Sequence, residues 1–151
     1  MAVDMKQVVR RLFEEAYGKG NMDVYEETCD SGYRGHDPLT GDASLDKARE
    51  NARGYKTAFP DLKPLILASY VDGDCCVTQW RMTGTHQKPL MGIAATGARC
   101  TVDGISIARF RGGKIIEDWT QWDALGLMKQ LGVTSEQQAA WRSGQESRPH
   151  A

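Results

Sequence analysis

The order of two patterns along the chain limits its fold more than any other feature. Up to Pro60, apolar residues recur at helical spacing in three segments, at 4–17, at 22–28 and after Ser44. From Leu62 the pattern changes to strands, at 63–71, 75–85, 99–110 and 115–122. Short turns separate most of these strands, which favours antiparallel hairpins over parallel crossovers. The sequence therefore predicts an α+β fold, with three helices before a mostly antiparallel sheet.

Breakers and capping residues set the limits of these segments. Ser44 can cap the third helix, and Asp123 can cap a short C-terminal helix that ends at residue 131. The stretch 33–41 is full of breakers and is predicted to lack regular structure. The segment 86–98 is predicted to be a long connection, and connections of this length often form lids or pocket walls.

Length and charge exclude several classes of protein. A chain of 151 residues fits one domain, predicted at 1–132, with a polar, partly disordered tail at 133–151. Its formal charge of -1 lacks the basic field that nucleic-acid binding needs. It has no apolar run of the roughly 20 residues that cross a membrane and no basic, then apolar leader, which predicts a cytoplasmic protein with no membrane contact. Four cysteines without a CxxC pair, and with no His at ligand spacing, predict buried reduced thiols and no metal site.

A set of short motifs carries a resemblance to a known family. The motifs are GHDP (35–38), FPDL (59–62), GTH (84–86), LMGI (90–93), VDGIS (102–106) and DWTQWD (118–123). Together with the order of the elements, they resemble the SnoaL-like polyketide cyclases, often labelled ester cyclases, of the NTF2-like superfamily. The resemblance implies a cone in which a strongly bent sheet wraps around three helices and encloses an apolar cavity. It also implies a homodimer through the outer face of the sheet.

Asp37 is the first candidate for catalysis. An Asp directly before Pro lies in extended or turn backbone, where its carboxylate can also simply stabilise the turn. In the related ketosteroid isomerases an Asp-Pro at the matching place carries the general base. A carboxylate inside an apolar cavity has its charged form destabilised, which moves its pKa toward the range useful for proton transfer at neutral pH.

The register of the last hairpin decides whether Asp118 is a second candidate. A two-residue turn at Gly112-Gly113 would pair Ser106 with Trp119, whereas a three-residue loop that begins at Arg111 would pair Ser106 with Asp118. The second register agrees with the family, whose pocket face on this strand includes the positions of Asp118 and Thr120. The alternative is an Asp118 that faces solvent.

Several activities known in the family depend on catalytic residues that this sequence lacks at the aligned positions. The acid/base Asp of the polyketide cyclase aligns with Thr120, and its pocket His aligns with Ser106. The epoxide hydrolase-like relatives need the same Asp, which makes that activity the less favoured one. The oxyanion-stabilising Tyr and carboxylic acid of ketosteroid isomerase align with Phe13 and Ser106, so that site is not reproduced.

The remaining candidates are histidines and large apolar side chains. His36 and His86 can each act as acid or base near neutral pH, or make structural hydrogen bonds; of the two we predict catalysis for His86 and substrate contact for His36. The other predicted substrate-binding residues are Phe13, Trp80, Met91, Ser106, Trp119, Thr120 and Trp122, although the large apolar ones suit an ordinary core as well.

The leading hypothesis is a cofactor-free enzyme that moves a proton on a hydrophobic carbonyl substrate, with isomerisation or aldol-type cyclisation. Asp37 and Asp118 would share the acid and base roles, while His86 and Ser106 orient the substrate oxygen. The alternative is a carrier that uses the same apolar cone to hold a small hydrophobic ligand without catalysis. A protein-interaction module is a weaker third possibility.

Overall fold

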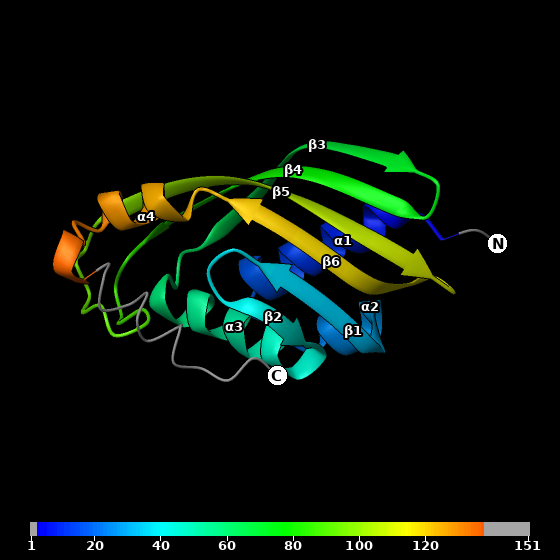
Figure 1. The fold of residues 1–151 in the computed structure, drawn as a ribbon, viewed down its shortest axis with the longest axis horizontal. Coiled ribbons are helices and arrows are strands. Elements are labelled where there is room, and N and C mark those ends of the chain that lie inside the picture. The colour runs from blue at the N-terminus through cyan, green and yellow to red at the C-terminus, as the bar shows by residue number, and fades with distance from the viewer. Residues whose placement is uncertain (1–2, 138–151) are drawn as a thin grey trace.

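The computed structural model describes residues 3–137 as a curved six-stranded sheet with helices on its inner side. The sheet order is β2-β1-β6-β5-β4-β3 (Figure 1). The strands are β1 (Cys29–Asp37), β2 (Gly41–Ser44), β3 (Lys63–Asp72), β4 (Cys75–Thr85), β5 (Arg99–Arg111) and β6 (Lys114–Trp122). Neighbouring strands are antiparallel except β1 and β6, which are parallel. The predicted α+β class and mostly antiparallel sheet are confirmed.

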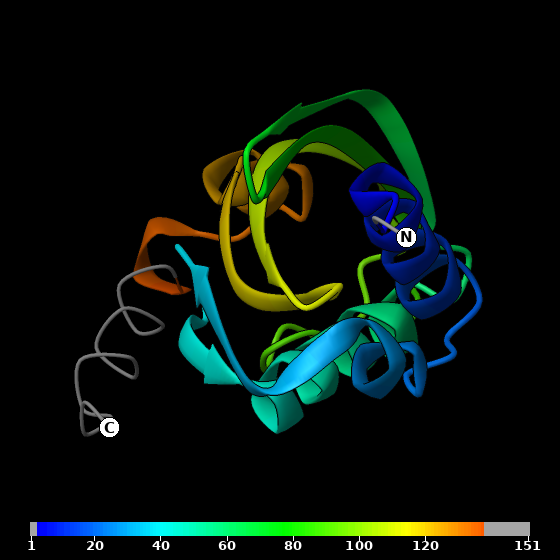
Figure 2. The same cartoon turned by 90° about the vertical axis from the view of Figure 1, so that its right-hand side faces the viewer.

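The helices close the concave side of this sheet. They are α1 (Met5–Leu12), its π-helical continuation η1 (Phe13–Gly18), α2 (Val24–Thr28), α3 (Leu45–Ala58) and the C-terminal α4 (Ala124–Gln130). Figure 2 shows strands β3 to β6 bending around an interior that α1 and α3 close from the other side. The predicted caps are present: Ser44 accepts from the Lys47 N–H at 3.3 Å, and Asp123 accepts from the Gly126 N–H at 2.8 Å.

The stretch 33–41 differs from its prediction. Most of it belongs to β1, and Gly41 begins β2, which pairs with β1 through contacts such as Arg34 with Ser44. On its other side β1 pairs with β6, about eighty residues away, where Gly35 lies opposite Asp118. Pairing with distant strands overrides the local preference of a sequence rich in turn-forming residues. The strand brings Gly35 and Asp37 of the GHDP motif beside β6, where both line the cavity described below.

The hydrophobic core joins α1, η1 and α2 to the inner face of the sheet. Val24, Cys76 and Ile115 are fully buried in it. Within residues 3–137, no helix is long and apolar enough to cross a membrane. Of the tail predicted at 133–151, the part from residue 138 onward lies outside the described residues.

Candidate functional site

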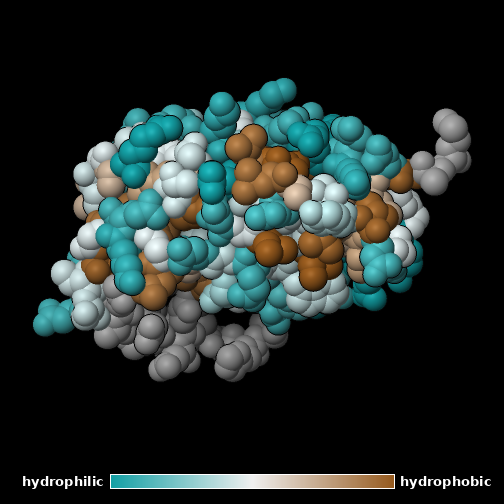
Figure 3. Space-filling model, turned by 90° about the horizontal axis from the view of Figure 1, so that it is seen from above, coloured by the Kyte–Doolittle hydropathy of each residue, from teal (hydrophilic) through white to brown (hydrophobic). Residues whose placement is uncertain are grey.

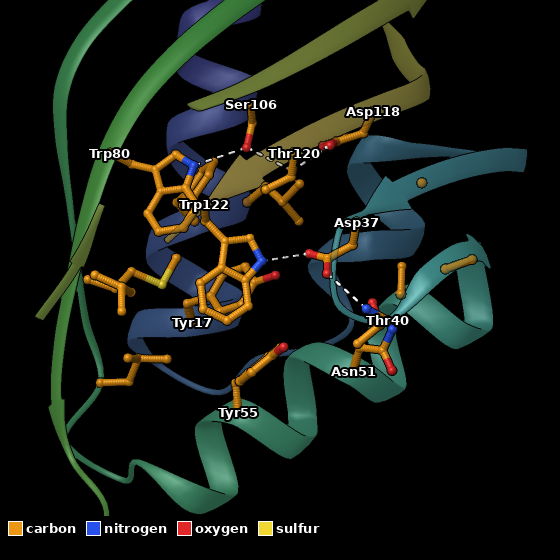
Figure 4. Close-up of a pocket in the computed structure, with 18 of the residues that line it drawn as sticks. Tyr17, Asp37, Thr40, Asn51, Tyr55, Trp80, Ser106, Asp118, Thr120 and Trp122 are labelled. Carbon is orange, nitrogen blue, oxygen red and sulfur yellow. Dashed lines mark hydrogen bonds between the residues drawn. The ribbon is translucent and has the colours of Figure 1, made fainter. Parts of the chain in front are cut away.

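A cavity of about 150 Å³ lies between the concave face of the sheet and the helices. Its wall is mainly apolar and aromatic, with polar side chains from six elements and the β1–β2 turn (Figure 4). The polar residues that line it are Tyr17, Tyr25, Tyr33, His36, Asp37, Thr40, Asn51, Tyr55, Ser106, Asp118 and Thr120. An apolar pocket with a few convergent polar groups is the usual form of a small-molecule site.

The register between β5 and β6 differs from the predicted one, but Asp118 still faces the pocket as predicted. Gly112-Gly113 form a two-residue turn, and Ser106 pairs with Thr120 rather than with Asp118, which lies opposite Ala108. A bulge next to the turn, where Ile116 is left without a partner, adds one residue to β6. That extra residue restores the alternation, so Asp118 and Thr120 face inward as predicted.

Asp118 is a half-buried carboxylate on the inner face of β6. Within the part of the chain that the structure describes, its one hydrogen-bond donor is the hydroxyl of Thr120, 3.0 Å from Oδ1. Burial, together with the nearby charge of Asp37, raises the pKa of Asp118 to about 6, although the Thr120 hydroxyl and His36 act to lower it. A carboxyl group with this pKa exchanges protons readily near neutral pH.

Asp37 occupies the end of β1 and is held by three donors. Its Oδ1 accepts from the backbone N–H groups of Leu39 and Thr40, at 2.8 and 3.0 Å, which is the turn-stabilising role that the sequence allowed. Its Oδ2 accepts from the indole N–H of Trp122 at 3.0 Å (Figure 4). These three hydrogen bonds fix the position of the Asp37 carboxylate.

A chain of hydrogen bonds leads from the indole of Trp80 to Asp118. The Trp80 N–H donates to Ser106 Oγ at 3.0 Å, and the hydroxyls of Ser106 and Thr120 are 2.9 Å apart. Thr120 then continues to Asp118 (Figure 4). Gly104 leaves room for this indole, because a side chain there would collide with the Trp80 ring. We call Trp80, Ser106, Thr120 and Asp118 the hydroxyl chain.

Four tyrosines line the pocket that the sequence reasoning did not select. The hydroxyls of Tyr17 and Tyr25 are 3.4 Å apart, and burial raises the pKa of Tyr17 to about 12. Tyr55 differs, because its hydroxyl oxygen is buried and has no hydrogen-bond partner among residues 3–137. Burial, with the charge of Asp37, raises the pKa of Tyr55 well above its ordinary value, so the phenol stays protonated.

The position of Tyr55 could have been found from the sequence. Its ring meets Trp122 edge-on, with centroids 6.1 Å apart. Asn51, one helical turn earlier on α3, points into the same pocket (Figure 4). Polar side chains four residues apart on an otherwise buried helix face were the available signal.

Several of the predicted substrate-binding residues lie in the pocket wall. Phe13 on η1 and Trp80 on β4 are buried there with their rings 6.0 Å apart, and Trp122 lies at the end of β6. Ser106 and Thr120 lie between them on the sheet. Their role in binding a substrate remains a prediction.

Trp119 does not bound the cavity, which corrects its prediction. Strand alternation turns it to the outer face, where it is 39% exposed and stacks on the ring of His36 at 5.5 Å. His36 contributes to the pocket wall, but its ring nitrogens bind Glu117 and Asp42, each at 2.8 Å. These carboxylates, Glu117 foremost, raise the pKa of His36. Its hydrogen bonds hold β2 and β6 to β1.

His86 and Met91 also lie outside this cavity, contrary to their predicted roles. His86 is fully buried, stacks on Phe59 at 5.4 Å, and its Nδ1 accepts from the backbone N–H of Thr96 at 3.2 Å. It therefore fastens the connection 86–98 to the fold, and it is not among the residues that line the main pocket. Met91 lies in that connection and lines a separate apolar hollow beside α4.

The fold and the pocket define the class of the protein: an NTF2-like cone with an apolar cavity that contains two carboxylates. More narrowly, the chain belongs to the SnoaL-like polyketide cyclase family, whose model matches residues 7–131. No match was found among proteins with curated functions.

Solved structures agree with this assignment. A protein from Jannaschia sp. CCS1, provisionally described as a SnoaL-like polyketide cyclase, is 26% identical, with a TM-score of 0.78 over 85% of this chain and 92% of that one. TsrD from Streptomyces laurentii is also 26% identical, with a TM-score of 0.78 over 88% and 100% of the two chains. IdmH from Streptomyces antibioticus, 24% identical with a TM-score of 0.74 over 85% and 98%, shares the fold.

Proposed function

We propose that this protein is an enzyme in which Asp118 removes and returns a proton next to a carbonyl group of a small hydrophobic substrate. The proton transfer would accompany isomerisation or aldol-type ring closure. The observation that carries this proposal is the environment of Asp118, a carboxyl group with one donor and a pKa of about 6 in an apolar pocket. The family's association with polyketide cyclases supports the same class of reaction.

Asp37 has a different part in this proposal. Three donors hold it, so its oxygens are already engaged. Its fixed negative charge raises the pKa of Asp118 and so keeps that group able to accept a proton from a weakly acidic carbon. The sequence-based hypothesis that both carboxylates exchange protons is thus narrowed to Asp118.

The cavity indicates the size and polarity of the substrate. About 150 Å³ accommodates one ring, since an apolar cavity of that size is known to bind benzene. Tyr55 on α3 offers a protonated phenol that no described residue engages, and Ser106 lies on the opposing sheet. Polar groups on both walls suit a compound with two oxygens, such as a keto ester.

The experiment is deuterium incorporation from heavy water into a pooled panel of keto esters and cyclic ketones, read by mass spectrometry. We expect exchange above buffer with the wild-type protein and a loss of about 100- to 10,000-fold in Asp118→Asn. The matched control is Asp103→Asn, because Asp103 is an exposed carboxylate on the neighbouring strand, paired with Arg81 at 2.8 Å. Wild-type exchange in Asp118→Asn would exclude Asp118 as the base, and no exchange in any protein would favour the carrier function.

We also propose that a second copy of the chain covers the outer face of the sheet. Figure 3 shows apolar side chains gathered on that face over β3 to β5. Tyr70 is 64% exposed there and Ile105 50% exposed, and Leu65 and Ile107 are exposed beside them. Sedimentation of the wild type and of Ile107→Glu tests the homodimer: we expect a dimer that the charge dissociates, and a monomeric wild type contradicts it.

A further inference from the structure

The hydroxyl chain offers an inference that goes beyond the base itself. Its three links, from Trp80 through Ser106 and Thr120 to Asp118, measure 3.0, 2.9 and 3.0 Å. All four residues line the pocket. Each hydroxyl has one proton, so the directions of the Ser106–Thr120 and Thr120–Asp118 links depend on the protonation of Asp118, whereas the indole always donates to Ser106.

An ionised Asp118 fixes the chain in one direction. The carboxylate can only accept, so Thr120 donates to Oδ1. Thr120 must then accept the proton of Ser106, and Ser106 accepts from the Trp80 indole, which can only donate. In this state the Ser106 proton is used within the chain and is not available to a ligand.

A protonated Asp118 permits the opposite direction. With the proton on Oδ1, the carboxylic acid donates to Thr120, and Thr120 turns its own proton to Ser106. Ser106 then accepts from both Thr120 and Trp80, and its own proton is released from the chain. The covalent bonds of both hydroxyls stay intact, because only their O–H bonds rotate.

We propose that Ser106 and Thr120 form a switch that turns the Ser106 hydroxyl into a hydrogen-bond donor for the substrate oxygen when Asp118 takes up the substrate's proton. In that step the C–H bond breaks, an O–H bond forms on Asp118, and the electron pair stays on the substrate as an enolate. One negative charge thus moves from Asp118 to the substrate oxygen. The donor is released as that charge arrives, which is when it stabilises the reaction most.

This use in catalysis rests on the proposed function, whereas the switch is a property of the protein without substrate. The other ionisable groups that act on or are influenced by Asp118 come from β1 and η1. They are Cys29, Tyr33, His36 and Asp37 on β1, and Tyr17 on η1. Of these, Asp37 and His36 affect the pKa of Asp118 itself.

The indole N–H of Trp80 reports the direction of the chain. When the Ser106 hydroxyl donates its proton to Thr120, in a chain that ends at a carboxylate, the Ser106 oxygen is polarised and becomes a better acceptor for the indole N–H. We therefore expect the Trp80 indole proton, followed by ¹H–¹⁵N NMR and assigned with Trp80→Phe, to move downfield as pH rises through about 6, the pKa of Asp118. Asp118→Asn should abolish this movement.

Thr120→Val separates the switch from a direct effect of charge through space. It removes the middle hydroxyl and leaves Asp118 able to titrate, which the carboxyl ¹³C signal verifies. We expect the Trp80 signal to lose most of its movement in Thr120→Val and to regain it in Thr120→Ser. The Trp122 indole signal, bonded to Asp37, checks in the same spectra that the pocket is intact.

The possible results each decide the proposal. Equal movement of the Trp80 signal in the wild type and in Thr120→Val overturns it, and so does a wild-type signal that ignores the titration of Asp118. Deuterium exchange lowered by about tenfold or more in Thr120→Val, and restored in Thr120→Ser, extends the switch to catalysis. If no protein exchanges deuterium but the NMR result holds, the proposed function fails while the switch stands.

Discussion

The end of β1 and the middle of β6 each place an aspartate in the same pocket, but the two carboxylates are held in opposite ways. Asp37 lies beside a turn, where three donors saturate it. Asp118 lies within a strand whose backbone is occupied by neighbouring strands, and one hydroxyl serves it. The backbone around each carboxylate thus decides how many hydrogen-bond donors reach it, which is three for Asp37 and one for Asp118 among the described residues.

The largest expected effect concerns the pH dependence of stability. The pKa of Asp118 is about 6 in the folded protein, above its ordinary 3.8, so folding favours the protonated form. Its contribution to stability is complete below the lower value and is lost as pH rises through the higher one. We expect the unfolding free energy of the wild type, relative to Asp118→Asn, to fall by roughly 2 kcal/mol between pH 4 and pH 7. Urea denaturation at both values measures it, and a difference that ignores pH would contradict the comparison.

Asp37→Asn tests the other carboxylate, whose contribution to stability comes from its three hydrogen bonds. The amide cannot accept from all three donors at once, since its NH₂ group would face the indole N–H of Trp122 or a backbone N–H. We expect a loss of about 1 to 3 kcal/mol in unfolding free energy at pH 7, again by urea denaturation. Asp103→Asn, on the exposed outer face, serves as the control. An equal loss of unfolding free energy in Asp103→Asn would mean that the hydrogen bonds of Asp37 contribute no more than those of an exposed carboxylate.

A smaller effect links the two carboxylates. The charge of Asp37 is one of the influences that raise the pKa of Asp118. Removing it in Asp37→Asn should move the pKa of Asp118 down toward its ordinary value, as carboxyl ¹³C titration would show. An unchanged or higher pKa of Asp118 would mean that the two groups do not interact.

The smallest effect on stability is expected at Tyr55. Its hydroxyl is buried and no described residue bonds to it, so Tyr55→Phe should remove no hydrogen bond and should change the unfolding free energy by less than about 0.5 kcal/mol. Tyr25→Phe is the comparison, because Tyr25 shares a hydrogen bond with Tyr17 at 3.4 Å and should lose more. A marked loss in Tyr55→Phe would show that its hydroxyl has a partner in solution.

Local patterns predicted most of the fold. Strand alternation and capping residues located β4 exactly and β3, β5 and β6 within one residue at each end, and Ser44 and Asp123 cap the helices as expected. β1 was not predicted as a strand because its glycines and its Asp-Pro end resemble a loop. Its pairing with β6 makes it a strand. Such pairing joins residues too far apart to leave a local pattern.

The site was predicted in part for the same reason. Asp37 and Asp118 were placed in the pocket by motif and alternation, while Tyr55 was missed because aromatic residues on a helix face look like ordinary core. Trp119 was assigned to the cavity although alternation with Asp118 turns it outward. His86 was misjudged because its burial under the connection 86–98 depends on tertiary contacts.

The bulge in β6 has a consequence for how this site can tolerate insertions and deletions. Ile116 is the extra residue that keeps Asp118 and Thr120 on the inner face after a two-residue turn. A deletion at the bulge would leave a regular hairpin with the same inward residues, whereas a deletion between Asp118 and Trp122 would turn one end of the strand over. The hairpin can therefore lose one residue at the bulge while Asp118 and Thr120 keep facing the pocket.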